Sequence, residues 1–167
     1  MPFTPLHMGP GIVFKAILQS YFSLMVFGWA QIVMDLQPLV VLITKQGHLH
    51  GFSHSYIGAT LLALFSALSG KYLAEFGLVI IKVSKPEDPI KITWWVSFTS
   101  AFIGTYSHII LDSIMHSDMA PFYPLSQSNG LLGLVTIDQL TLFCLLSAVL
   151  GACLYYWVQF RSKQSHN

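Results

Sequence analysis

The stretch WWVSFTSAFIGTYSHIILDSIMHSD, residues 94–118, begins as an apolar segment and ends in regularly spaced ionisable residues. His108, Asp112 and His116 are each four residues apart, so on a helix all three project from one face. Asp118 follows two residues later. An ionisable group inside a membrane segment is costly unless it pairs or binds a ligand. We therefore expect a helix here that carries a functional site near one end.

Apolar segments continue on both sides of this stretch. Clear spans run from Ile92 to about Ile114, from Ser55 to about Ile81 and from Leu131 to about Val158, each near or above the roughly 20 residues that cross a bilayer. Hydrophobic residues make up 54% of the chain and charged residues 9%, which favours a membrane protein. The net charge of +1 lacks the basic excess of nucleic-acid binding. We predict an all-α fold, a polytopic membrane helical bundle of four to five transmembrane or re-entrant helices, with residues 1–167 as a single domain.

The first 44 residues fit two arrangements. A single span from Tyr21 to Thr44 would leave Asp35 in the middle of the membrane. In a helical hairpin, Gly9 to Gln19 would run in, the chain would turn at Gln19-Ser20, and Tyr21 to Met34 would run back. Helices of this length reach only about 17–21 Å, against a hydrocarbon core of about 30 Å. We favour the hairpin nonetheless, because it removes a lone carboxylate from the bilayer centre.

The hairpin has consequences for the polar residues of this segment. Asp35 would end the second helix, with Pro38 just beyond it as a stop signal. His7 would lie at the same end and give Asp35 a partner. The opening residues MPFTPLHMGPG lack the basic region of a signal peptide, so we expect the first segment to remain in the mature protein.

A second histidine cluster lies in the loop HLHGFSHS, residues 48–55. Gly51 and Ser53 resemble a turn and an N-cap before a helix that would start at His54. His50 and His54 are four residues apart and enter the next span from the same end as residues 108–118. His48 is expected to be solvated.

The remaining charges separate from the histidines. Residues 70–91 contain Lys71, Glu75, Lys82, Lys85, Glu87, Asp88 and Lys91, and no histidine. By the positive-inside rule this loop and the C-terminus face the cytoplasm, so the histidine end faces away from it. Asp138, which we place about two turns into the last span, has two interpretations: it orients a metal-bound histidine, or it bonds a hydroxyl across helices. The loop at residues 121–130 is expected to cover the site.

Five motifs in this order resemble a known family, the inner-membrane metal-dependent hydrolases, some of whose members are described as LexA-regulated. The matching stretches are LHMGPG (6–11), MDLQP (34–38), HGFSHS (50–55), SHIILD (107–112) and FYPLS (122–126). The chain differs from the family pattern where D-x-D-H is reduced to Asp35-Leu36-Gln37-Pro38. It also lacks the family's arginine after His50, and residues 115–118 replace a threonine–proline turn.

The resemblance implies an enzyme of the bacterial inner (plasma) membrane, with its site at the non-cytoplasmic end. Histidine and aspartate together are ligands for zinc, manganese or iron, of which we favour zinc. We expect His54, His108 and Asp112 as metal ligands, and His50, His7 and Asp35 as further ligands or as the set of a second ion. We expect Asp118 or His116 to act as general base or as acid for the leaving group.

A site at the bilayer surface favours a lipid or lipid-linked phosphoester or ester as substrate. Three other interpretations remain open. They are a metal carrier or channel, a b-type haem protein with His54 and His108 as axial ligands, and an assembly protein in which the polar residues only hold helices together.

Overall fold

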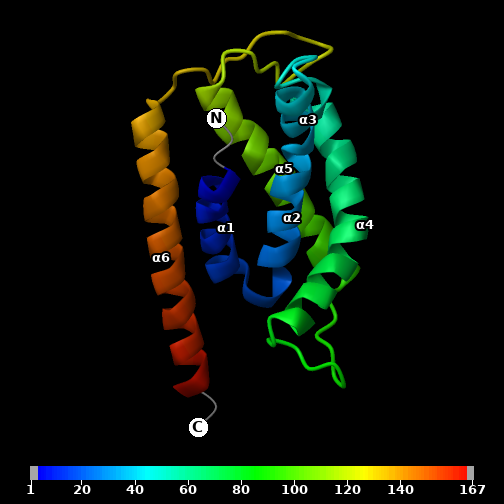
Figure 1. Cartoon of the computed structure of the whole chain (residues 1–167). Coiled ribbons are helices and arrows are strands. Elements are labelled where there is room, and N and C mark those ends of the chain that lie inside the picture. The colour runs from blue at the N-terminus through cyan, green and yellow to red at the C-terminus, as the bar shows by residue number, and fades with distance from the viewer. Residues whose placement is uncertain (1–3, 165–167) are drawn as a thin grey trace.

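The computed structural model describes residues 4–164, which form helices and loops and no strand (Figure 1). The helices are α1 (Thr4–Leu18), α2 (Leu24–Met34), α3 (Leu36–Thr44), α4 (Tyr56–Ile80), α5 (Trp94–Met115) and α6 (Ile137–Gln164). Two short 3₁₀ turns cover Gln19–Tyr21 and Phe52–His54. The predicted all-helical bundle is therefore confirmed.

Residues 4–34 form the helical hairpin. Helix α1 turns at the 3₁₀ segment and α2 runs back beside it, ending at Asp35 (Figure 1). The prediction that Pro38 acts as a helix stop signal is wrong, because a new helix, α3, begins directly after Asp35 and includes Pro38. Pro38 lies in the first turn of α3, where a backbone N–H has no helical acceptor, so its ring breaks no hydrogen bond.

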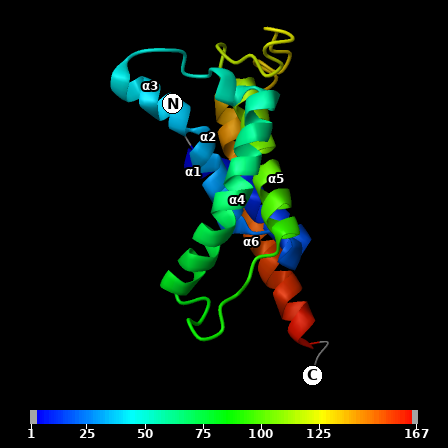
Figure 2. The same ribbon diagram turned by 90° about the vertical axis from the view of Figure 1, so that its right-hand side faces the viewer.

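Helix α3 leaves the axis of α2 and leans away from the bundle (Figure 2). Its apolar side chains are exposed, among them Leu39, Val40 and Ile43, and Pro38 is the buried residue of this helix. An exposed helix with almost no polar residue is suited to contact with lipid.

Helices α2, α4 and α5 pack against one another and form the centre of the bundle. Helix α4 presents small residues to this interface, namely Ala59, Ala63, Ala67, Gly70 and Ala74. Small side chains let helix backbones approach closely, which replaces the hydrophobic driving force that is missing between helices in lipid.

Helix α6 packs mainly on α1, on the side opposite to α4 (Figure 1). A Cβ atom added at Gly9 would overlap the carbonyl oxygen of Cys144, and one at Gly151 would meet the backbone of Val13. The two helices are thus in backbone contact at both positions.

Within residues 4–164, three helical segments are long and apolar enough to cross a membrane: α2 with α3 (Leu24–Thr44), α4 and α6. Helix α5 has 22 residues but buries a polar face, which lowers its hydropathy; this face consists of Ser97, Ser100, Thr105, His108, Asp112 and Ser113. The predicted start of the last span at Leu131 is wrong. Residues 131–136 belong to the preceding loop, where Gly133 has φ of +70°, and α6 extends past Val158 to Gln164.

Candidate metal centre

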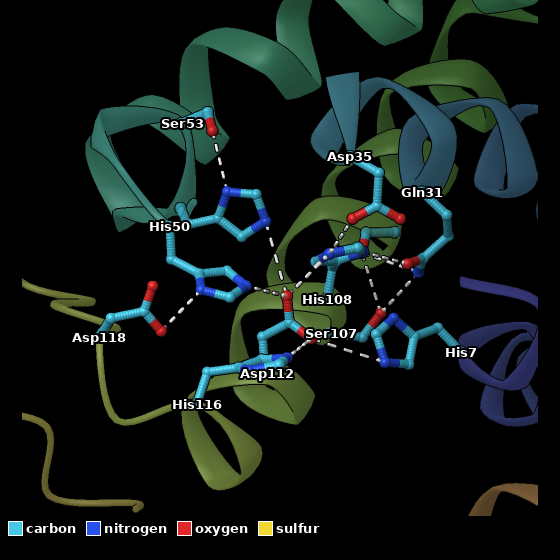
Figure 3. A network of polar contacts seen from close by, with 12 residues as sticks. His7, Gln31, Asp35, His50, Ser53, Ser107, His108, Asp112, His116 and Asp118 are labelled. Carbon is cyan, nitrogen blue, oxygen red and sulfur yellow. Dashed lines mark hydrogen bonds and ion pairs between the residues drawn. The ribbon is translucent and has the colours of Figure 1, made fainter. Parts of the chain in front are cut away.

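All of the residues singled out from the sequence as metal ligands or acid–base groups meet at one end of the bundle (Figure 3). His7 comes from α1, Asp35 from the end of α2, and His54 from the 3₁₀ turn before α4. Helix α5 supplies His108 and Asp112. His116 caps the C-terminus of α5, and His50 and Asp118 come from loops.

The carboxylate of Asp112 is the centre of this cluster, with its side chain only 5% exposed. Its Oδ2 atom lies 3.1 Å from Nε2 of His108, 3.5 Å from Nε2 of His54 and 3.9 Å from Nε2 of His50. Its Oδ1 atom lies 3.7 Å from Nε2 of His7 and 3.9 Å from Nε2 of His116. Five imidazole nitrogens therefore surround one carboxylate.

Seven of these eight residues form two groups of possible ligands, and His7, which was predicted as a ligand, belongs to neither group. The inner group consists of Asp35, His54, His108 and Asp112, each offering a ligand atom within 4.8 Å of the others. In it, Oδ1 of Asp35 lies 3.3 Å from Nε2 of His108. The outer group consists of His50, His116 and Asp118, with the same limit on separation.

The position of the proton on His108 follows from Gln31, a residue that the sequence analysis did not single out. The amide nitrogen of Gln31 donates to the carbonyl oxygen of Gly104 at 3.1 Å, so its Oε1 faces Nδ1 of His108 at 2.7 Å. The Nδ1–H of His108 donates to that oxygen. In the neutral ring, Nε2 then presents a lone pair to the carboxylates of Asp35 and Asp112.

Two further histidines are held in the same way. Nδ1 of His50 donates to Oδ1 of Asp118 at 2.8 Å, and Nδ1 of His54 lies 2.9 Å from the hydroxyl of Ser53. A hydrogen bond at one ring nitrogen fixes the other for a metal, as in known metal sites. Burial opposes ionisation of Asp118, but the hydrogen bond from His50 lowers the pKa of Asp118 below its usual value.

The inner group fits a metal ion better than it fits a set of hydrogen bonds. Nε2 of His54 and of His108 are buried and make no hydrogen bond, although carboxylate oxygens lie within 3.5 Å. Around a tetrahedral ion with bonds of about 2.0–2.2 Å, neighbouring ligand atoms are about 3.3–3.6 Å apart. The distances from Asp112 to His54 and from Asp35 to His108, 3.5 and 3.3 Å, lie in that range, and the distance of 3.1 Å from Asp112 to His108 is slightly shorter. Two carboxylates also balance the charge of one divalent ion.

The loop that carries His50 and His54 is fixed by neighbours outside the site. The side chain of Gln37 donates to the carbonyl oxygen of His48 and accepts from the backbone N–H of Ser53 at 3.1 Å. Gln37 stands at the position of the second aspartate in the D-x-D-H pattern, and here its side chain holds the loop through two hydrogen bonds. The predicted N-cap is wrong by two residues: Ser55 caps α4 by accepting from Gly58, which leaves the Ser53 hydroxyl for His54.

Other expectations are corrected by the structure. The contact partners differ from the predicted pairing, since His7 faces Asp112 and Asp35 faces His108. Asp138 lies exposed in the first turn of α6, so it does not reach inward as predicted.

The connecting loops at this end agree with their predicted places. His48 is exposed, as expected. The loop after α5 crosses the end of the bundle, where the carbonyl oxygen of Pro121 accepts from Tyr56 (Figure 1).

The comparisons with known proteins agree with an integral membrane protein. The family model described as YdjM inner membrane protein matches residues 12–166. The searches among curated proteins and among solved structures found no match. The family description confirms the predicted inner-membrane location and leaves hydrolysis as a prediction. With nearly its whole length matched and three apolar helices long enough to span a bilayer, the chain belongs to the YdjM inner membrane protein family.

Proposed function

We propose that this protein is a membrane-embedded metal-dependent hydrolase whose inner group holds a divalent transition metal, zinc foremost. The observation that carries this proposal is the orientation of His108. Gln31 occupies its Nδ1–H, and its Nε2 is buried against two carboxylates without a hydrogen bond. A lone pair and two anionic oxygens in one place are stable together only with a cation among them.

A divalent ion held there supplies Lewis-acid chemistry, lowering the pKa of a bound water and polarising the scissile bond. Asp35, Asp112, His54 and His108 hold it in place, and Gln31 and Ser53 fix the two imidazole rings. With this ion alone, proton transfer falls to His116 or Asp118. Both lie on the more open side of the site, with side chains 20% and 49% exposed.

A lipid or lipid-linked phosphoester or ester is the substrate class that we propose. Helix α3 starts directly at the ligand Asp35 and exposes Leu39, Val40 and Ile43. Such a molecule could place its head group at the metal while its apolar part remained in the lipid along α3.

Two other functions fit this geometry less well. The ring centroids of His54 and His108 are 5.4 Å apart, which leaves no room for a porphyrin between them, so these two cannot be its axial pair. A metal carrier needs ligands along a path. Deeper between α2, α4 and α5, apolar side chains such as Val26 and Ala67 are buried beside serines such as Ser97, whose hydroxyl donates to the carbonyl oxygen of Ala67.

The strongest alternative is a bundle in which a protonated His108 on α5 pairs with Asp112 and with Asp35 at the end of α2, and only joins these helices. Metal content of the detergent-purified protein, measured by inductively coupled plasma mass spectrometry, separates the two. We expect at least one equivalent of a transition metal in the wild type and in the control His48→Ala, since His48 is exposed. We expect its loss in His108→Ala and in Asp112→Ala. A wild-type protein that takes up no metal, even after reconstitution, would favour the structural role.

A further inference from the structure

We propose that the outer group is a second metal site, and that Asp112 bridges it to the ion of the inner group. The proposal rests on the proposed function of the inner group and deepens it. Together the two groups would form a binuclear centre in which the carboxylate of Asp112 serves both ions.

The carboxylate of Asp112 lies between the two groups, as a bridging carboxylate requires (Figure 3). Oδ2 faces His54 and His108 of the inner group at 3.5 and 3.1 Å, and His50 of the outer group at 3.9 Å. Oδ1 faces His116 of the outer group at 3.9 Å, and His7 at 3.7 Å. The two ions of binuclear hydrolases are about 3.5–4 Å apart, which is a separation that one carboxylate spans.

The histidines of the outer group offer lone pairs to this space. His50 donates its Nδ1–H to Asp118, so its free lone pair is on Nε2, which lies 3.9 Å from Oδ2 of Asp112. The rings of His50 and His116 stack with centroids 4.2 Å apart and planes at 28°. Nε2 of His116 lies 3.9 Å from Oδ1 of Asp112, so a nitrogen of each stacked ring faces the same carboxylate.

Exposure increases from the inner group to the outer group. The side chain of His108 is fully buried, those of His50 and His116 are 8% and 20% exposed, and that of Asp118 is 49% exposed. In the inner group the Asp35 side chain is 19% exposed, and those of His54, His108 and Asp112 are at most 5% exposed. The outer ion is expected to be the more weakly bound and the first to be lost to a chelator.

The charge of the cluster favours two ions and an anionic substrate. Asp35, Asp112 and Asp118 are the carboxylates of the two groups. With neutral imidazoles, a single divalent ion leaves the cluster negative, whereas a second ion makes it positive. A positive centre attracts a phosphoester and offers little advantage to a neutral ester. With the second ion bound, His116 and Asp118 would be its ligands and would not take the role in proton transfer that they have when only the inner ion is bound.

Electron paramagnetic resonance of the full-length protein loaded with Mn²⁺ tests this arrangement. We expect the wild type and His48→Ala to bind two ions that show the exchange coupling of a carboxylate-bridged pair. His116→Ala should bind one ion and give the six-line signal of isolated Mn²⁺. Asp118→Asn, on a half-exposed loop residue that does not threaten folding, should weaken the outer ion and leave the inner one.

The outcomes distinguish this proposal from the proposed function. One uncoupled ion in the wild type, unchanged by His116→Ala, would overturn the second site and leave the mononuclear hydrolase standing. No bound ion at all would remove both. Inorganic phosphate is the probe of the charge argument: calorimetry should show it binding at least about tenfold more weakly to Mn²⁺-loaded His116→Ala than to the wild type. Equal binding would contradict the phosphoester assignment.

Discussion

Gln31 decides which nitrogen of His108 is available to bind a metal. Its own hydrogen bonds join it to the carbonyl oxygen of Gly104 and to Nδ1 of His108. Its amide is neutral and lies in an apolar helix, so a search of the sequence for histidine and acidic residues passes over it. The signal was nevertheless present. Gln31 is four residues before Asp35 and therefore on the same helix face as the ligand.

Replacing Gln31 should weaken metal binding without removing a ligand. In Gln31→Ala the Nδ1–H of His108 loses its acceptor and the ring is free to change its tautomer or turn. We expect metal affinity to fall by about 10–100-fold, the usual loss for such a partner. Competition with a chromophoric chelator measures it. Gln159→Ala is the matched control, because Gln159 bonds only Gln19 at the far end of the bundle. Equal affinities in the two variants would show that Gln31 does not position His108.

The ligand residues themselves were predictable because each one is costly in an apolar chain. The hairpin predicted His7 and Asp35 at the same end of the bundle, and both lie there, although His7 faces Asp112 and Asp35 faces His108. Which oxygen each histidine faces was not predictable. It depends on how α1 and α2 are rotated against α5, and small residues such as Gly11 and Gly104 set this rotation through their contacts with Phe27.

Among the elements, the 3₁₀ turn before α4 shows how a site depends on backbone contacts outside it. A Cβ atom added at Gly58 would overlap the carbonyl oxygen of Phe52, within the turn that carries His54. We expect Gly58→Ala to displace this turn, at a cost of about 1–3 kcal/mol of stability, and to lower metal content. Thermal unfolding and metal analysis measure the two effects.

Gly130→Ala is the control for that prediction, because an added Cβ there meets no atom within 4 Å. Full metal content in Gly58→Ala would mean that the turn adapts without moving His54.

Element boundaries were predicted less well than the elements themselves. A serine at position 53 and a serine at position 55 are equally good N-caps by residue type, and the choice of Ser55 follows from the packing of Gly58 against the turn. The apolar run after Leu131 has helical composition, but the positive φ of Gly133 belongs to a loop. Composition does not separate such a loop from a helix start.

At the scale of the whole molecule, the metal centre and the basic loop lie at opposite ends. The loops around residues 45–55 and 116–136 lie at the end of the candidate metal centre, and the loop at 81–93 lies at the opposite end, as does the C-terminal end of α6 (Figure 1). The separation of histidines from lysines in the sequence predicted this polarity. This polarity could be predicted from the sequence because successive loops of a helical bundle lie at alternate ends.

The positive-inside rule predicts which end faces the cytoplasm. In a variant with Cys144 and Cys153 changed to Ser, Gln127→Cys should react with a membrane-impermeant maleimide in intact cells. Glu87→Cys should react only after the membrane is permeabilised. Both positions are exposed in loops, so the two variants control for each other. The opposite labelling pattern would place the metal centre on the cytoplasmic side.

The sharing of one carboxylate by five imidazoles has a consequence for how this centre responds to combined changes. Residues that act on one common partner do not contribute independently, so the losses from two substitutions fall short of their sum. Once Asp112 is gone, a change in any of the five histidines has little left to remove. In genetic terms the cluster is strongly epistatic. The effect of substituting any one of these histidines depends on whether Asp112 is still present.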